Sequence, residues 1–251
     1  MKIKNVINLI LVPVAIFIVW WIVAASGIFS SFLLPSPADV GKAFWDMVQN
    51  GELLNHVLAS SVRVLGGFVI AACIAIPLAY VIYCSPTQEK RLQLTLEALR
   101  FIPPLSLVPL LILWLGIGEA PKLAIVILAS FFPIYLNVFS GLKQIDRSYN
   151  ELATILKLSR WEKFKHIEFP SSLPTILTGL RLGFGYSWRA LVGAELIAAS
   201  SGLGYLIGDS SELSRTDKVF VGIFCIAILG ILGDQLFRFF DRFLKYREQK
   251  K

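Results

Sequence analysis

The chain has 251 residues; 56% are hydrophobic, 16% are charged, and Lys plus Arg (24) outnumber Asp plus Glu (17). A soluble globular domain is typically about 45–50% apolar and about 25% charged. Together with a mean hydropathy of +0.69, this composition argues against a soluble enzyme, a disordered chain and a nucleic-acid-binding protein. The net charge of +7 is small enough to belong to the cytoplasmic loops of a membrane protein.

The cysteines and histidines indicate neither a disulfide framework nor a metal site. Cys73, Cys84 and Cys225 lie in or beside apolar runs, so we interpret them as small hydrophobic residues. His56 and His166 are far apart in the sequence, which argues against a histidine-based metal cluster.

Long apolar runs predict an all-α integral membrane protein with six transmembrane helices, because about 20 apolar residues cross a bilayer. The short alternating segments of a membrane β-barrel do not occur. The first run exceeds the usual length of a signal-peptide core, so we expect it to be retained. Three prolines interrupt the third run and three charged residues the fifth. The predicted spans are 6–25, 64–84, 101–118, 123–142, 173–199 and 219–237.

The distribution of positive charge predicts that both termini are cytoplasmic. Lys and Arg concentrate on the cytoplasmic side of membrane proteins. With a cytoplasmic N-terminus, most of the 24 Lys and Arg residues, Arg100 among them, fall in inner segments. The exceptions, apart from two arginines within the fifth span, are Lys42, Arg63, Lys122, Arg215 and Lys218, which would lie outside.

The outer segment between the first two spans begins with the proline-rich stretch 34–37. Residues 39–57 mix apolar and polar side chains, which fits either a short amphipathic helix on the outer membrane face or an ordinary loop. We favour the loop.

The inner segment 143–172 is basic and carries apolar residues at helical spacing, which predicts one amphipathic helix or a pair. We expect Pro170 and Pro174 to end this helix before the fifth span. Such a helix can lie on the lipid surface, pack on its own bundle or dock on a soluble partner, and composition does not choose among the three.

A motif within this segment resembles the inner loop of ABC importer permeases. That family pattern is Glu-Ala-Ala, three residues, Gly, nine residues, then Ile-x-Leu-Pro. Glu151, Ala153, Ile167 and Pro170 match it at the same spacing, whereas Lys157 stands in place of the glycine. Because glycine serves where φ is positive, lysine predicts a continuous helix or an altered turn.

Six further motifs are similar to one branch of these permeases, the nitrate, sulfonate, taurine and bicarbonate importers. The likeness extends from about residue 34 to about residue 238. The motifs are LPSP at 34–37, RFIPP at 100–104, LWLGIG at 113–118, LTGLR at 177–181, AELIAA at 194–199 and SGLGY at 201–205.

The resemblance implies a type I ABC importer permease fold, like that of the methionine importer permease, with a cytoplasmic coupling helix. It divides the chain into a first helix (1–27), a periplasmic loop (28–62), a permease core (63–238) and a basic cytoplasmic tail (239–251). The implied coupling residues are Glu151, Ala153, Lys157, Leu158, Arg160, Trp161, Ile167 and Pro170.

The same resemblance implies the partners of the chain. They are a second permease copy in a homodimer, two ABC ATPase subunits, a periplasmic or lipid-anchored substrate-binding protein, and the lipids of the inner membrane. The chain contains no Gly-x-x-x-x-Gly-Lys-[Ser/Thr] sequence. We therefore expect no cofactor, metal or catalytic residue in this chain, and ATP to be bound by a partner.

The charges of the fifth span are candidates for the substrate pathway, because a charged side chain at membrane depth usually faces a cavity or a partner. One hypothesis is that Arg189, with Ser187 and Trp188, lines the pore and attracts a small anion. The other is that Arg189 pairs with a carboxylate or carbonyls of another helix. Glu195 is a further tentative pathway residue. The glycines of this span indicate a packing face.

We predict a permease subunit for a small oxyanion such as a sulfonate, nitrate or bicarbonate. Related permeases carry a pyrimidine precursor of thiamine, which stays an alternative. Rival classes are an ion-gradient-driven transporter, which would show repeated broken-helix halves, an intramembrane enzyme, which would need a catalytic constellation, and a structural anchor.

Overall fold

The computed structural model describes residues 3–248, with side chains over 11–149 and 151–242. Every regular element in the described range is helical, as predicted. In chain order these are α1 (Ile3–Ala25), α2 (Pro37–Gln49), α3 (Glu52–Tyr83), α4 (Pro86–Arg100), η1 (Pro104–Leu107), α5 (Val108–Leu115), α6 (Glu119–Lys143), α7 (Arg147–Ile155), α8 (Arg160–Lys163), η2 (Phe164–Glu168), α9 (Phe169–Ala198), α10 (Leu203–Glu212) and α11 (Thr216–Glu248).

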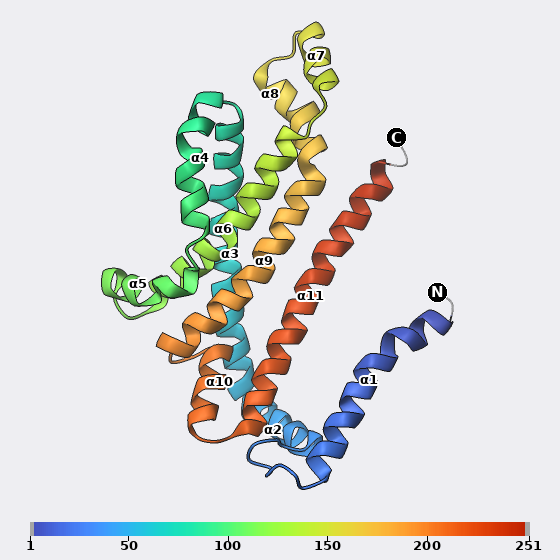
Figure 1. Ribbon diagram of the computed structural model, residues 1–251, viewed down its shortest axis with the longest axis vertical. Helices are drawn as coiled ribbons and strands as arrows, with labels where there is room; N and C mark the ends of the chain where they lie inside the picture. The colour runs from blue at the N-terminus through green and yellow to red at the C-terminus, as the bar shows by residue number, and fades with distance from the viewer. Residues whose placement is uncertain (1–2, 249–251) are drawn as a thin grey trace.

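The centre of the molecule is formed by α6, which packs along both α3 and α9 (Figure 1). Small residues permit the close approach, because a Cβ on Gly67 of α3 would lie 2.5 Å from Val126 of α6. A Cβ on Gly183 of α9 would likewise lie 2.8 Å from the Ile134 side chain of α6. The predicted packing face is confirmed there, although Gly185 faces open space.

Three helices (α3, α6 and α11) are long and apolar enough to cross a membrane uninterrupted. Two helix pairs, each bent at a break, meet the same criterion together, α4 with η1 and α5 (82°) and α8–α9 with α10 (45°). The described apolar part of α1, Leu11–Ala25, is shorter. The described residues thus contain three spanning helices, or five if each bent pair is one span, and these segments and α1 overlap the six predicted spans. Figure 1 places α7 and α8 at one end of the molecule and α2 and α10 at the other.

The predicted boundaries of the third span were wrong. Residues 101–103 separate α4 from η1 instead of beginning a helix. Pro103 and Pro104 cause the break, because proline lacks the backbone N–H and disfavours helix in the residue before it. The segment assigned to an inner loop before this span is helix α4.

The outer segment is a helix, so the preference for a loop was also wrong. Ser36 caps α2 reciprocally with Asp39, and the Asp39 amide donates to Ser36 Oγ at 3.2 Å. Val40, Ala43 and Met47 are buried. Because α2 packs against α11 and α3, the bundle covers the face that carries these three residues.

The inner segment continues into the membrane without the expected stop at Pro170 and Pro174. A π-helical turn, η2, joins α8 to α9, and both prolines lie within α9. A π-turn shifts the hydrogen-bond register, which accommodates the N–H that Pro170 lacks. Helix α11 likewise extends through the predicted tail as far as Glu248.

Candidate coupling segment and translocation cavity

Helices α7 and α8 form a tip that extends beyond the bundle (Figure 1). Apolar side chains on this tip are exposed, among them Ile155 (76%) and Trp161 (69%). A helix packed on its own bundle would bury them, so that alternative is wrong for these residues. The remaining exposed apolar residues of the tip are Tyr149, Leu152 and Leu156.

Lys157 occupies a left-handed backbone conformation, with φ of 50°. The Leu158 amide donates to the Ala153 carbonyl at 3.0 Å, and the Lys157 amide donates to the Thr154 carbonyl at 3.1 Å. This pair of bonds is the Schellman arrangement that ends a helix, in which glycine is usual. Of the two alternatives predicted for Lys157, the continuous helix is therefore wrong, and lysine takes the turn that the family pattern assigns to glycine.

The second half of the tip begins with a capping box. The Ser159 hydroxyl donates to Glu162 Oε2 at 2.6 Å, and the Ser159 amide donates to the same oxygen at 2.8 Å. These bonds hold the pKa of the Glu162 carboxyl below its usual value. The start of α8 is thus fixed three residues after the Lys157 turn.

Buried contacts tie the tip to the membrane helices. Glu168 is 2% exposed, accepts a hydrogen bond from the Tyr80 hydroxyl of α3 at 3.0 Å, and pairs with Lys163 Nζ at 2.9 Å. The Phe164 ring lies 4.7 Å from the Tyr80 ring. A displacement of α8 therefore acts directly on α3 and on the start of α9.

The predicted coupling residues divide by exposure. Ala153 and Ile167 are buried and Leu158 is half-buried. The exposed members, which a partner can contact, are Glu151, Lys157, Arg160, Trp161 and Pro170.

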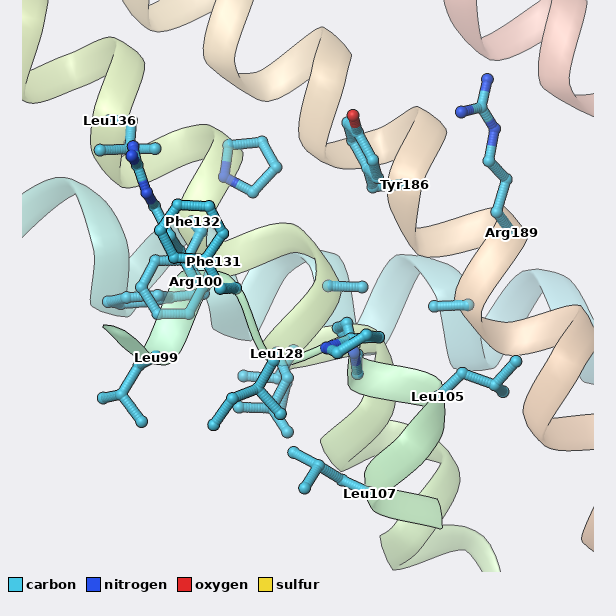
Figure 2. Close-up of a pocket in the computed structure, with 18 of the residues that line it drawn as sticks. Leu99, Arg100, Leu105, Leu107, Leu128, Phe131, Phe132, Leu136, Tyr186 and Arg189 are labelled. Atoms are coloured by element: carbon cyan, nitrogen blue, oxygen red, sulfur yellow. The ribbon is translucent and has the colours of Figure 1, made fainter. Parts of the chain in front are cut away.

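A cavity of about 900 Å³ opens beside the break between α4 and α5, bounded also by α6 and α9 (Figure 2). Its walls are mainly apolar and include Phe131 and Phe132. Two cations, Arg100 and Arg189, line it, and its lining includes no Asp or Glu among the residues that the structure describes. Sequence reasoning missed Arg100, although a cation directly before a Pro-Pro break was a signal, since broken helices at membrane depth often line a cavity.

Arg189 is exposed, and its guanidinium lies 5.7 Å from the centre of the Tyr186 ring. Over the part of the chain that the structure describes, it has no carboxylate or carbonyl partner, so the hypothesis of an intrachain ion pair is not met. Arg181 differs, because its Nη2 donates to Asp234 of α11 at 3.0 Å.

The neighbours of Arg189 face the bundle. Ser187 is fully buried and donates to the Phe184 carbonyl at 2.7 Å. Trp188 is 6% exposed, and its Nε1 is a buried donor without a partner among the described residues.

Glu195 lies in a buried ion-pair network at the end of the molecule opposite the tip. Arg63 of α3 donates to Glu195 at 2.7 Å and to Glu119 of α6 at 2.8 Å. The Ser60 hydroxyl and the Gly204 amide also bond to the Glu195 carboxylate, both at 2.9 Å. The network joins α3, α6, α9 and α10, and it leaves the Glu195 carboxylate occupied by donors of this chain.

This network explains the SGLGY motif. Gly202 has φ of 118°, and a Cβ there would lie 2.2 Å from Glu195 Oε1. A Cβ on Gly204 would lie 2.5 Å from the Val192 carbonyl. Two glycines are required so that the backbone can close over the carboxylate.

Arg63 and Lys122 were assigned to segments between spans, whereas both are buried within helices, Arg63 in α3 and Lys122 in α6. The Lys122 ammonium pairs with Glu119 at 3.0 Å. The sequence did hold a signal, because buried basic residues require acidic partners. The partners of Arg63, however, lie 56 and 132 positions away along the chain, and one sequence alone does not reveal such pairs.

The family model for the binding-protein-dependent transport system inner membrane component matches residues 71–246. The chain belongs to this family. The SsuC permease protein of Escherichia coli (strain K12), whose name refers to aliphatic sulfonates, is 40% identical over 222 residues, covering 88% of this chain and 84% of that protein.

Two further likenesses agree with this membership. The nitrate import permease protein NrtB of Synechocystis sp. (strain ATCC 27184 / PCC 6803 / Kazusa) is 31% identical over 248 residues, covering 95% of this chain and 90% of that protein. A chain from an inward-facing structure of the MetNI methionine ABC transporter superposes with a TM-score of 0.69 at 14% identity, covering 76% of this chain and 95% of that chain.

Membership of the family settles the general role. The chain is a multi-pass inner membrane permease subunit of a binding-protein-dependent ABC importer, and it is not an enzyme. Such an importer includes an ATPase and a substrate-binding protein. The rival classes considered from the sequence, a gradient-driven transporter, an intramembrane enzyme and an anchor, are therefore excluded.

Proposed function

We propose that two copies of this chain form the translocation path for a small oxyanion such as a sulfonate or nitrate. The observation that carries the proposal is the apolar cavity at the α4–α5 break, which holds Arg100 and Arg189 without an acidic residue. Relatives whose names refer to sulfonates and nitrate agree with an anionic cargo.

The cavity suits an anion because neither Arg100 nor Arg189 has an ion-pair partner within the described part of the chain. An arginine at membrane depth costs about 2.5–3.5 kcal/mol on insertion scales. A sulfonate or nitrate that accepts charge-assisted hydrogen bonds from Arg189 compensates part of that cost. The aromatic wall of Phe131 and Phe132 offers an apolar surface to the organic part of a sulfonate.

The tip of α7 and α8 is the proposed docking site for the ATPase, with one ATPase on each permease copy. Exposed Ile155 and Trp161 would fill an apolar groove on that partner, with Arg160 at the polar rim. The contacts of Glu168 with α3 would then transmit the movement of the ATPase to the membrane helices. ATP is bound by the ATPase, both termini of the permease are cytoplasmic, and the binding protein docks on the side of α2 and α10.

The test is ATP-dependent uptake of radiolabelled taurine and nitrate by the complete importer in proteoliposomes. Arg189→Gln removes charge-assisted bonds of about 1.5–3 kcal/mol, so we expect uptake to fall about 10- to 100-fold while the complex remains assembled. Arg189→Lys should retain part of the activity, because charge remains without the planar donor array.

Arg91→Gln is the matched control, because Arg91 is an exposed arginine of α4 outside the cavity lining. Its uptake should equal that of the unaltered chain. Unchanged uptake in Arg189→Gln would contradict the proposal, and so would loss of assembly in that variant, which would assign Arg189 to the architecture.

A further inference from the structure

A second hollow, of about 990 Å³, runs between α9 and α11. Along α11 the lining of this hollow changes from apolar to charged toward the C-terminal end. Ile226, Ala227, Gly230 and Ile231 form an apolar stretch, and Arg238 and Arg242 follow toward the C-terminal end. In Figure 1 the C-terminal part of α11 points toward the end of the molecule that carries α7 and α8.

The charged end of the groove has an excess of positive charge. Among the described residues that line the groove, Asp234 is the acidic one, and two arginines already share it. Asp241, beside Arg242 in the sequence, lies close enough to act electrostatically on Arg181, so the arginines of this end still outnumber its carboxylates. Arg181 donates to it at 3.0 Å and Arg238 at 2.8 Å. Arg242 is exposed and has no ion-pair partner within the described part of the chain, so an anion can bind there without displacing a native contact.

The length of the groove matches one leaflet of a bilayer. Ile226 and Arg242 are 16 residues apart, which corresponds to about 24 Å at 1.5 Å per residue. Half of a membrane with its headgroup regions is about 20–22 Å thick. Arg238 and Arg242 lie 7 and 11 residues after Ile231, about 10 and 16 Å farther along α11, which places the arginines toward the level of lipid headgroups.

A lipid fits this surface better than a second copy of the chain does. The carboxylates that a second copy would bring at membrane depth include Glu119, Glu195 and Asp234, and each already has an arginine partner within its own chain. A phospholipid provides both an anionic headgroup at one end and an apolar chain at the other.

We infer that the α9–α11 groove binds an anionic phospholipid from the leaflet on the side of α7 and α8. The phosphate lies between Arg238 and Arg242, and an acyl chain lies along Ile226–Ile231. Basic pockets between transmembrane helices bind anionic headgroups in this way. The groove adjoins the proposed oxyanion cavity, because Arg189 lines both, but its headgroup end at Arg238 and Arg242 is not part of that cavity lining.

The test is native mass spectrometry of the purified full-length permease in detergent, titrated with phosphatidylglycerol or phosphatidylcholine. Each arginine near the headgroup contributes about fivefold to the affinity for an anionic lipid, so phosphatidylglycerol should bind about 30-fold more tightly. The double variant R238Q/R242Q should remove this preference. Arg242→Gln, at an exposed position, should reduce it about fivefold with little risk to folding.

Arg91→Gln, the same change at an exposed site on α4, should leave the preference intact. Equal affinities for the two lipids would overturn the inference, as would an unchanged preference in R238Q/R242Q. If inorganic phosphate alone displaced phosphatidylglycerol at equal concentration, the groove would be a free-anion site and the inference would also fail. Cross-linking of two copies through the groove in lipid-saturated protein would assign it to a dimer interface.

Discussion

Replacing Lys157 with glycine should stabilise the turn between α7 and α8. Lys157 adopts φ of 50°, a conformation that costs an L-residue roughly 1–2 kcal/mol. Glycine avoids that cost but gives the unfolded chain more freedom, which offsets about 0.4–1 kcal/mol. The net gain is therefore about 1 kcal/mol, which corresponds to about a fivefold change in the equilibrium for local opening.

Hydrogen exchange at the Leu158 amide measures this opening, because that amide donates to the Ala153 carbonyl across the turn. In Lys157→Gly its exchange should slow about fivefold. Lys157→Ala is the control, since alanine keeps the Cβ and the strain, and its exchange should match that of the unaltered chain. Equal exchange in the glycine variant and the unaltered chain would refute the reasoning, and so would slowing by alanine and glycine alike.

Two other substitutions test the network and the tip. Gly202→Ala should lower the melting temperature of the purified permease by several degrees, because the added Cβ would overlap the Glu195 carboxylate. Gly41→Ala is the control, since a Cβ there has no neighbouring atom within 4 Å, and it should not lower the melting temperature. Equal losses in the two variants would contradict the account. Trp161→Ala should weaken ATPase binding in a pull-down assay by more than tenfold, because an exposed aromatic anchor is lost; unchanged binding would exclude Trp161 from the interface.

The apolar runs predicted the helical class and the approximate position of each span, because period and length are local properties. The start of the third span was misplaced because α4, despite its polar composition, meets the spanning criterion together with η1 and α5 across the break at Pro103–Pro104. The capping pair Ser36 and Asp39 was a local sequence signal for the start of α2, and the prediction of a loop did not take it into account.

The candidate site divides in the same way. The motif around Glu151 located the tip, because it is contiguous in sequence. The cavity required the structure, because Arg100 and Arg189 come from helices far apart in the chain. The role of Glu195 could not be read from its own helix, since its partners Arg63 and Ser60 lie on α3.

The central claim is that a separate ATPase binds the tip formed by α7 and α8 on the cytoplasmic side. Its most direct test is Ile155→Cys, in a chain whose three native cysteines are replaced by alanine, probed in inside-out and right-side-out vesicles that hold either the permease alone or the assembled importer. We expect a membrane-impermeant thiol reagent to label this cysteine only in inside-out vesicles and only without the ATPase, and a bifunctional cross-linker to join it to the ATPase in the assembled importer. Labelling in right-side-out vesicles, or the absence of any cross-link to the ATPase, would contradict the claim.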